Sequence, residues 1–348
     1  MTGMNGGRSR RPRLLLLLTA IAVVVAAAVA TGVEGSPSSA VSPVQAQRVV
    51  RAYDRAETLA TLRLSAPAQD AVEVPPESII DDATFAALHD QGQRRSAPAP
   101  QTDVRITVYV PVQHRGAETF AAYVSSRVHG QPGAILMVFR RTRAGGRWRQ
   151  SMSPAYPGAG SPPPVAVGAG GYVQSLGPST QARRLRLTAG TVAADYAGLL
   201  ELAGRGDRLA SGNPFAAGAY TSRLAASDRQ VVAQLTGAGG TVTGTALPAP
   251  YSGLTLRLRG GGGLVLFTVS VRQSFAARAG LSLRQAANRT PWSPLLAPGS
   301  YRQVSTTTLM TVAAVVPPAG SASPVRVVAE TASVIAVRAL QAGSATTA

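Results

Sequence analysis

Residues 254–272, LTLRLRGGGGLVLFTVSVR, decide the fold class of this chain. Two runs dominated by Leu and Val stand on either side of four consecutive glycines at positions 260–263. Aliphatic and β-branched residues favour strands, and glycines between two such runs favour a tight connection. The stretch therefore predicts two antiparallel strands, at residues 254–259 and 264–272, joined by the glycines.

Two further strand-like runs follow, at residues 304–316 and 325–340. Both are longer than the usual strand of about five or six residues. We therefore expect the sheet that they form to be strongly curved or bulged.

The second half of the chain opens with helices. Residues 191–202 carry apolar side chains at the spacing of one helix face, and Gly204 and Gly206 end this helix. A further helix is predicted from Asn213 to about residue 235, before the strands begin.

The first half repeats this order of helices followed by strands. Its first helix has a clear start signal, because Ser42 precedes a proline and Gln45 stands at the third helical position. The elements predicted here are a helix from residue 43 to about residue 60, a short helix at 82–88, a strand of alternating apolar residues at 104–112, a helix at 117–128, and a hairpin of strands at 134–141 and 147–152.

The sequence thus predicts an α+β protein with an N-terminal transmembrane helix and two helix-then-antiparallel-sheet domains. A chain of 348 residues is too long for one ordinary domain. The predicted segments are a cytoplasmic basic N-terminus at 1–13, a transmembrane anchor or signal segment at 14–33, a linker at 34–43, a first α+β domain at 44–180, a second α+β domain at 181–341 and a flexible tail at 342–348.

The N-terminal apolar segment begins at Leu14, ends at Val33 and contains no charged residue. Twenty helical residues span about 30 Å, the thickness of the hydrocarbon core of a bilayer. Four arginines precede the segment, so the N-terminus is predicted to stay in the cytoplasm. The chain is therefore predicted to cross the cell membrane once, with the region after residue 33 outside the cell. The alternative is cleavage near Ala30, which would release a secreted protein.

The composition limits the chemistry and suggests partners. The net charge is +18, all basic residues are arginine, and there is no cysteine, which excludes disulfides and Cys-ligated metal sites. A basic exterior favours anionic lipid or an acidic wall polymer, although it also fits a soluble surface without a specific partner. Nucleic acid is not expected outside the membrane. The densest arginine run, at residues 140–149, brackets Gly145-Gly146 and is predicted to be an exposed hairpin tip.

No catalytic, cofactor-binding or metal-ligating residue is predicted. His89, His114 and His129 lack the spacing of a metal site, and no G-x-S-x-G motif supplies a nucleophilic serine. Carboxylates remain as acid–base candidates. Asp81-Asp82 are predicted to cap a helix, Glu73 and Glu77 to lie in a loop around Pro75-Pro76, and Asp195 and Glu201 to lie on a helix without sharing its face closely.

Four segments carry a resemblance to a known family: QAQRVVRAYDRAETLA at 45–60, RITVYVPV at 105–112, AETFAAYV at 117–124 and GAILMVFRRTRAGGRWRQSMSP at 133–154. Together they resemble a family of actinobacterial membrane-anchored proteins of unknown function. The order of helices and long strands in the second half resembles the cone-shaped NTF2-like fold. NTF2-like enzymes commonly pair Asp with His in the cone, and the second half contains no histidine.

The sequence therefore predicts a non-enzymatic, membrane-tethered, extracytoplasmic interaction or assembly module of the cell envelope, with an envelope protein as its partner. The alternative is a binding protein for an apolar small molecule or lipid in an NTF2-like pocket. A hydrolase would require two carboxylates that converge in a cleft.

Overall fold

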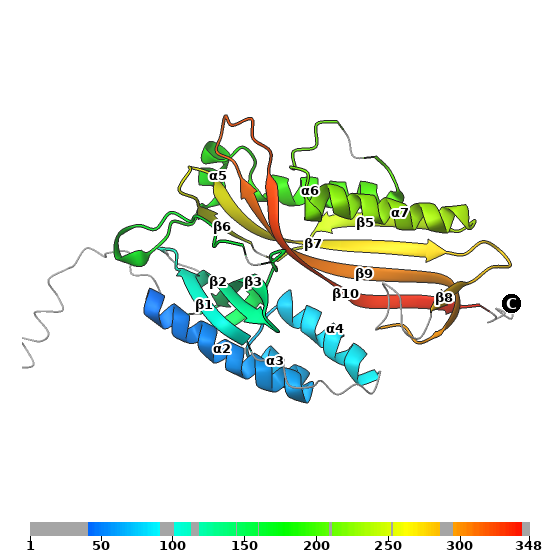
Figure 1. Cartoon of the computed structure of the whole chain (residues 1–348), viewed down its shortest axis with the longest axis horizontal. Helices are drawn as coiled ribbons and strands as arrows, with labels where there is room; N and C mark the ends of the chain where they lie inside the picture. The colour runs from blue at the N-terminus through cyan, green and yellow to red at the C-terminus, as the bar shows by residue number, and fades with distance from the viewer. Residues whose placement is uncertain are drawn as a thin grey trace, which may run out of the picture. The chain divides into compact units, whose positions relative to one another are not determined.

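The fold is described by a computed structural model (Figure 1). The described residues are 41–90, 101–112, 118–143, 145–158, 160–208, 211–251, 253–285 and 295–342. The predicted transmembrane segment at 14–33, His114 and residues 343–348 of the predicted C-terminal tail lie outside these ranges. No helix within them combines the length and apolar character that a membrane span needs.

The first half begins with three helices, α2 (Pro43–Arg63), α3 (Ala66–Asp70) and α4 (Glu77–Asp90). The predicted start of α2 is confirmed as a reciprocal capping box. The Ser42 backbone N–H donates to the Gln45 side-chain oxygen at 2.8 Å, and the Ser42 hydroxyl accepts from the Gln45 backbone N–H at 3.2 Å. These contacts satisfy two N–H groups that would otherwise lack partners at a helix start.

Four antiparallel strands follow in the spatial order β1-β2-β3-β4. They are β1 (Gln101–Tyr109), β2 (Glu118–Val128), β3 (Gln131–Arg141) and β4 (Arg149–Met152). The predicted hairpin is confirmed as β3 and β4, with Val138 opposite Met152.

The helix predicted at residues 117–128 is wrong, because this segment forms strand β2. Phe120 and Ala122 pack into the cluster beneath α2, whereas Ala121 and Tyr123 pack on the opposite face of the sheet. A strand buried on both faces reads as a continuous apolar run without alternation. The alanines in this run favour a helix when only local preference is considered.

The second half contains α5 (Pro178–Arg184), α6 (Ala189–Arg205) and α7 (Leu224–Gly237). Helix α6 is confirmed, and Gly206 ends it with a left-handed φ of 84°. The helix predicted from Asn213 starts later, with a π-helical turn at Ala219–Arg223 that leads into α7. Residues 214–216 are extended instead because their backbone bonds to Val325, with the Ala216 N–H donating to the Val325 carbonyl at 2.7 Å.

The second sheet has six antiparallel strands. They are β5 (Thr241–Pro248), β6 (Leu254–Arg257), β7 (Gly263–Ala276), β8 (Leu283–Gln285), β9 (Gly299–Val316) and β10 (Arg326–Gln341). The main order is β10-β9-β7-β5, with β6 paired to β7 and β8 paired to β9. The glycine-linked strand pair is confirmed as β6 and β7, and the expected irregularity of the long strands is confirmed by register shifts along β10. Strands β5 and β8 were not predicted.

The two sheets pack face to face and helices cover their outer sides, giving the layer order helix, sheet, sheet, helix. One apolar cluster joins the sheets, with Tyr123 and Leu136 from the first and Leu256, Leu266 and Ala313 from the second. Residues 39–348 form one compact unit. The helix-then-sheet order of each half is confirmed, whereas separate domains at 44–180 and 181–341 stay a prediction. The ends of β7, β9 and β10 extend beyond the first sheet (Figure 1).

Candidate ligand-binding site

A cavity of about 800 Å³ lies between α2, α4 and the first sheet. Its floor is aliphatic and consists of Val104, Ile106, Val124, Ile135 and Met137. Ile106, Val124 and Ile135 are opposite one another on β1, β2 and β3, so they form one continuous row across the sheet. These three side chains are only half-buried, and Val104 beside them is 49% exposed.

The opposite wall of the cavity is acidic. Helix α2 contributes Asp54 and Glu57, and helix α4 contributes Glu77 and Asp81. Residues three or four positions apart lie on the same face of a helix, so each helix turns two carboxylates toward the cavity.

Behind this wall lies Glu73, which is 1% exposed. Its Oε1 accepts a hydrogen bond from the Tyr53 hydroxyl at 2.5 Å and another from the Gln69 amide. The same amide donates to Asp81 Oδ2 at 2.9 Å, which links the buried carboxyl to the cavity wall. Burial raises the pKa of Glu73 to about 9, and the charge of Asp81 adds to this effect. Glu73 is therefore protonated at neutral pH.

Glu77 is the most buried carboxylate of this wall, with 6% of it exposed. Its Oε1 accepts a hydrogen bond from the Ser153 hydroxyl, whereas its Oε2 accepts none from the described residues. Burial raises the pKa of Glu77 to about 7, Ser153 opposes the shift, and the charge of Asp81 adds to it. Glu77 thus changes charge near neutral pH.

Gln150 supplies a second unsatisfied acceptor in the cavity lining. Its side chain is 2% exposed, and its Oε1 accepts no hydrogen bond within the described part of the chain. A buried acceptor without a donor costs roughly 1–3 kcal/mol. The site therefore combines an aliphatic floor with two acceptors, on Glu77 and Gln150, that require a hydrogen-bond donor.

The structure assigns other roles to the carboxylates than those expected. Helix α4 begins at Glu77, so Asp81 and Asp82 lie in its second turn and the predicted capping role is wrong. Glu73, Glu77 and Asp81 instead come together around the cavity. Glu201 is held by Arg205 at 2.5 Å, one turn further along α6.

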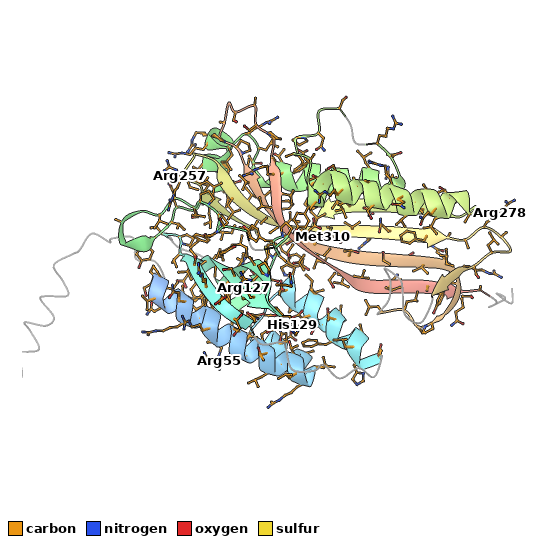
Figure 2. The ribbon with its side chains drawn as sticks, in the orientation of Figure 1. Arg55, Arg127, His129, Arg257, Arg278 and Met310 are labelled. Carbon is orange, nitrogen blue, oxygen red and sulfur yellow. The ribbon has the colours of Figure 1, made fainter. Side chains whose placement is uncertain are left out.

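His89, His129 and the described arginines of the run at 140–149 do not line this cavity. His89 is exposed near the end of α4, and His129 lies in the turn between β2 and β3 (Figure 2). No group of three or more metal-ligating side chains converges among the residues that the structure describes. The predicted exposed hairpin tip is wrong in part, because Arg141 is largely buried, pairs with Glu118 and lies 5.0 Å from the Trp148 ring centre.

Sequence reasoning missed most of the polar cavity lining. One signal was available on α2, where Glu57 falls within the apolar stripe that contains Val50, Tyr53 and Ala60. An acidic residue in the buried stripe of a helix indicates a partner or a cavity on that face. Gln150 and Ser153 offered no such signal, because their position depends on strand pairing.

One family model matches residues 37–339, and it is described as a domain of unknown function (DUF8094). This finding confirms the resemblance to a family without a known function. No curated protein matches the chain significantly, and no solved structure does.

Proposed function

The chain belongs to the DUF8094 family, a domain of unknown function, and we propose that this protein binds an apolar small molecule or lipid and releases it unchanged. The proposal places the binding domain outside the cell membrane, tethered by residues 14–33. An actinobacterial source and an NTF2-like relation of the second half are part of the same proposal and rest on the sequence alone.

The aliphatic floor of the cavity carries this proposal. Small-molecule sites are typically concave, mostly apolar, and about 300–1,000 Å³ in volume, with a few polar groups that orient the ligand. The cavity of about 800 Å³ has this size and this division of surfaces. Covering the half-exposed row of Ile106, Val124 and Ile135 with a ligand would gain roughly 25 cal/mol for each Å² removed from water.

The location differs from the expected pocket in the second half. The space between α6 and the second sheet is filled by a cluster that includes Tyr196, Phe267 and Val312, which are all buried. The cavity of the first half is therefore the better candidate for a ligand.

Binding of a neutral ten-carbon probe, decanol, tests the proposal. The full-length protein in phosphatidylcholine nanodiscs is titrated by calorimetry, with empty nanodiscs as the reference. The double variant Ile106→Thr/Val124→Thr removes aliphatic surface from the floor and is expected to weaken decanol binding about tenfold, since each lost methylene-sized group is worth about 0.8 kcal/mol.

A matched control is Val44→Thr/Val128→Thr, which changes two exposed valines outside the cavity. It is expected to bind decanol like the native protein. Absence of saturable decanol binding, or equal weakening by both double variants, would overturn the proposal.

A second candidate function, contact with an anionic envelope polymer, is favoured by the uncovered part of the second sheet. A hollow of about 880 Å³ there is lined by Ser and Thr side chains, by Asp207, and by Arg205, Arg272 and Arg338, of which Arg205 is paired with Glu201. We propose that this surface contacts poly(glycerol phosphate) or a similar acidic chain. Exposed arginines elsewhere, such as Arg55 and Arg278, are spread over separate elements (Figure 2).

This second function predicts that Arg272→Gln/Arg338→Gln weakens retention on immobilised poly(glycerol phosphate) and flattens its salt dependence. The control, Arg278→Gln/Arg326→Gln, removes two exposed charges that do not line the hollow. Equal loss in both variants would show that only the net charge matters.

A further inference from the structure

We propose that the ligand of the first-half cavity is an organic cation, an apolar body that carries a protonated amine, with the amine held by Glu77 and Gln150 and the apolar part on the aliphatic floor. This inference rests on the proposed binding function and names the chemical class of its ligand.

The distribution of charge is the first argument. The chain has 34 basic and 16 acidic residues, yet four carboxylates, Asp54, Glu57, Glu77 and Asp81, line this one cavity. Arg51, on α2, is the one basic side chain among the described residues of the lining, and it is exposed. A cleft lined by one sign of charge and backed by apolar walls concentrates ions of the opposite sign. The cavity thus selects a cation although the protein as a whole is strongly basic.

The second argument is independent of charge and comes from hydrogen bonding. Glu77 Oε2 and Gln150 Oε1 are buried acceptors that receive no hydrogen bond from the described residues. Buried acceptors of this kind are normally satisfied. An ammonium group has three N–H donors and no acceptor, so it has enough donors for both oxygens, whereas a carboxylate ligand could satisfy neither. A hydroxyl group has one donor and could satisfy only one of them.

The arrangement of the lining favours an organic cation over a metal ion. Hard metal ions require several converging oxygen ligands at short distances, and no such group converges among the described side chains. The acidic wall instead faces the row of Ile106, Val124 and Ile135 across the cavity. A molecule with one cationic end and one aliphatic end matches both surfaces.

Three ten-carbon probes that differ only in their head group test this inference, namely decylammonium, decanol and decanoate. They are titrated at pH 8 into the full-length protein in phosphatidylcholine nanodiscs, with empty nanodiscs as the reference. Decylammonium is expected to bind at least tenfold more tightly than decanol, and decanoate more weakly than decanol. Ile106→Thr/Val124→Thr is expected to weaken decylammonium and decanol alike.

Glu77→Gln keeps the shape of the side chain and removes its charge, so it is expected to abolish most of the preference for decylammonium over decanol. Glu57→Gln, on α2, is a second variant with the same expectation in case the first does not fold. Asp90→Asn is the matched control because it removes an exposed carboxylate from the same helix as Glu77 without touching the cavity.

The outcomes separate the two proposals. Equal affinity for decylammonium and decanol, or tighter binding of decanoate, would overturn the cation inference and leave the binding function in place. Failure of both decanol and decylammonium to bind would overturn the binding function and the inference with it. A preference for decylammonium that Asp90→Asn reduces as much as Glu77→Gln would assign the effect to net charge and would also overturn the inference.

Discussion

Replacing Glu73 by glutamine should change how the stability of the protein depends on pH. Glutamine has nearly the same shape and can still accept hydrogen bonds from Tyr53 and Gln69, which both donate to Glu73 Oε1. The variant differs mainly because it has no proton to lose. At pH 5, where the native Glu73 is protonated and uncharged, the native protein and Glu73→Gln should have similar stability.

The sign of the effect follows from the two pKa values of Glu73. In the unfolded chain its pKa is near 4.5, whereas burial raises the pKa to about 9 in the folded protein. Between these values the unfolded state binds fewer protons than the folded state, so stability is present at low pH and is lost as the pH rises toward 9. Each pH unit in this window removes about 1.4 kcal/mol from the free energy of unfolding.

The expected magnitude is large enough to measure. From pH 5 to pH 8 the native protein should lose roughly 4 kcal/mol relative to Glu73→Gln. For a chain of 348 residues, with an unfolding entropy of about 2.1 cal/mol/K per residue, that corresponds to a Tm difference of roughly 6 °C in favour of the variant at pH 8. Thermal unfolding of both full-length proteins at pH 5, 6, 7 and 8 measures it directly.

A control variant and the shape of the pH curves test this expectation. Asp90→Asn, which removes an exposed carboxylate on α4, should follow the pH dependence of the native protein. Parallel pH curves for the native protein and Glu73→Gln would refute the reasoning, because they would mean that Glu73 ionises in the folded state as readily as in water.

Three further substitutions test the local structure, each by urea unfolding of the full-length protein. Ser42→Ala removes the side-chain cap of α2 and should cost about 1 kcal/mol, and no loss would mean that the capping box contributes nothing. Gly206→Ala places a side chain at a φ of 84° and should cost about 1 kcal/mol or more, whereas an unchanged midpoint would contradict the left-handed helix end. Glu118→Gln leaves the largely buried Arg141 without its charged partner and should lower the free energy of unfolding by about 2 kcal/mol. The double variant Glu118→Gln/Arg141→Gln should restore part of this loss. Equal loss in the single and double variants would argue against the ion pair.

Local signals determined several elements of this protein in advance. The start of α2 could be predicted because Ser42 and Gln45 act on backbone groups within one helical turn. The end of α6 at Gly206 and the glycine-linked pair of β6 and β7 could be predicted for the same reason. In each case the interacting groups are close in the sequence, so the residues alone specify the contact.

Strand β2 shows where local signals end. Its apolar residues face α2 on one side and the second sheet on the other, and neither neighbour is adjacent in the sequence. The alternation that identifies a half-buried strand is therefore missing, and the alanines favour a helix until packing is considered. The start of α7 also depends on a contact that is distant in the sequence, because residues 214–216 are extended only through their pairing with Val325.

By itself, the sequence determined the α+β class, the order of helices before strands in each half, the strongly basic composition and the absence of cysteine chemistry. The candidate site was decided only by tertiary structure. Asp54 and Glu57 come from α2, Glu77 and Asp81 from α4, and Gln150 from β4, so their convergence depends on how these elements pack. The raised pKa values of Glu73 and Glu77 have the same origin, since burial and the charge of Asp81 exist only in the folded chain.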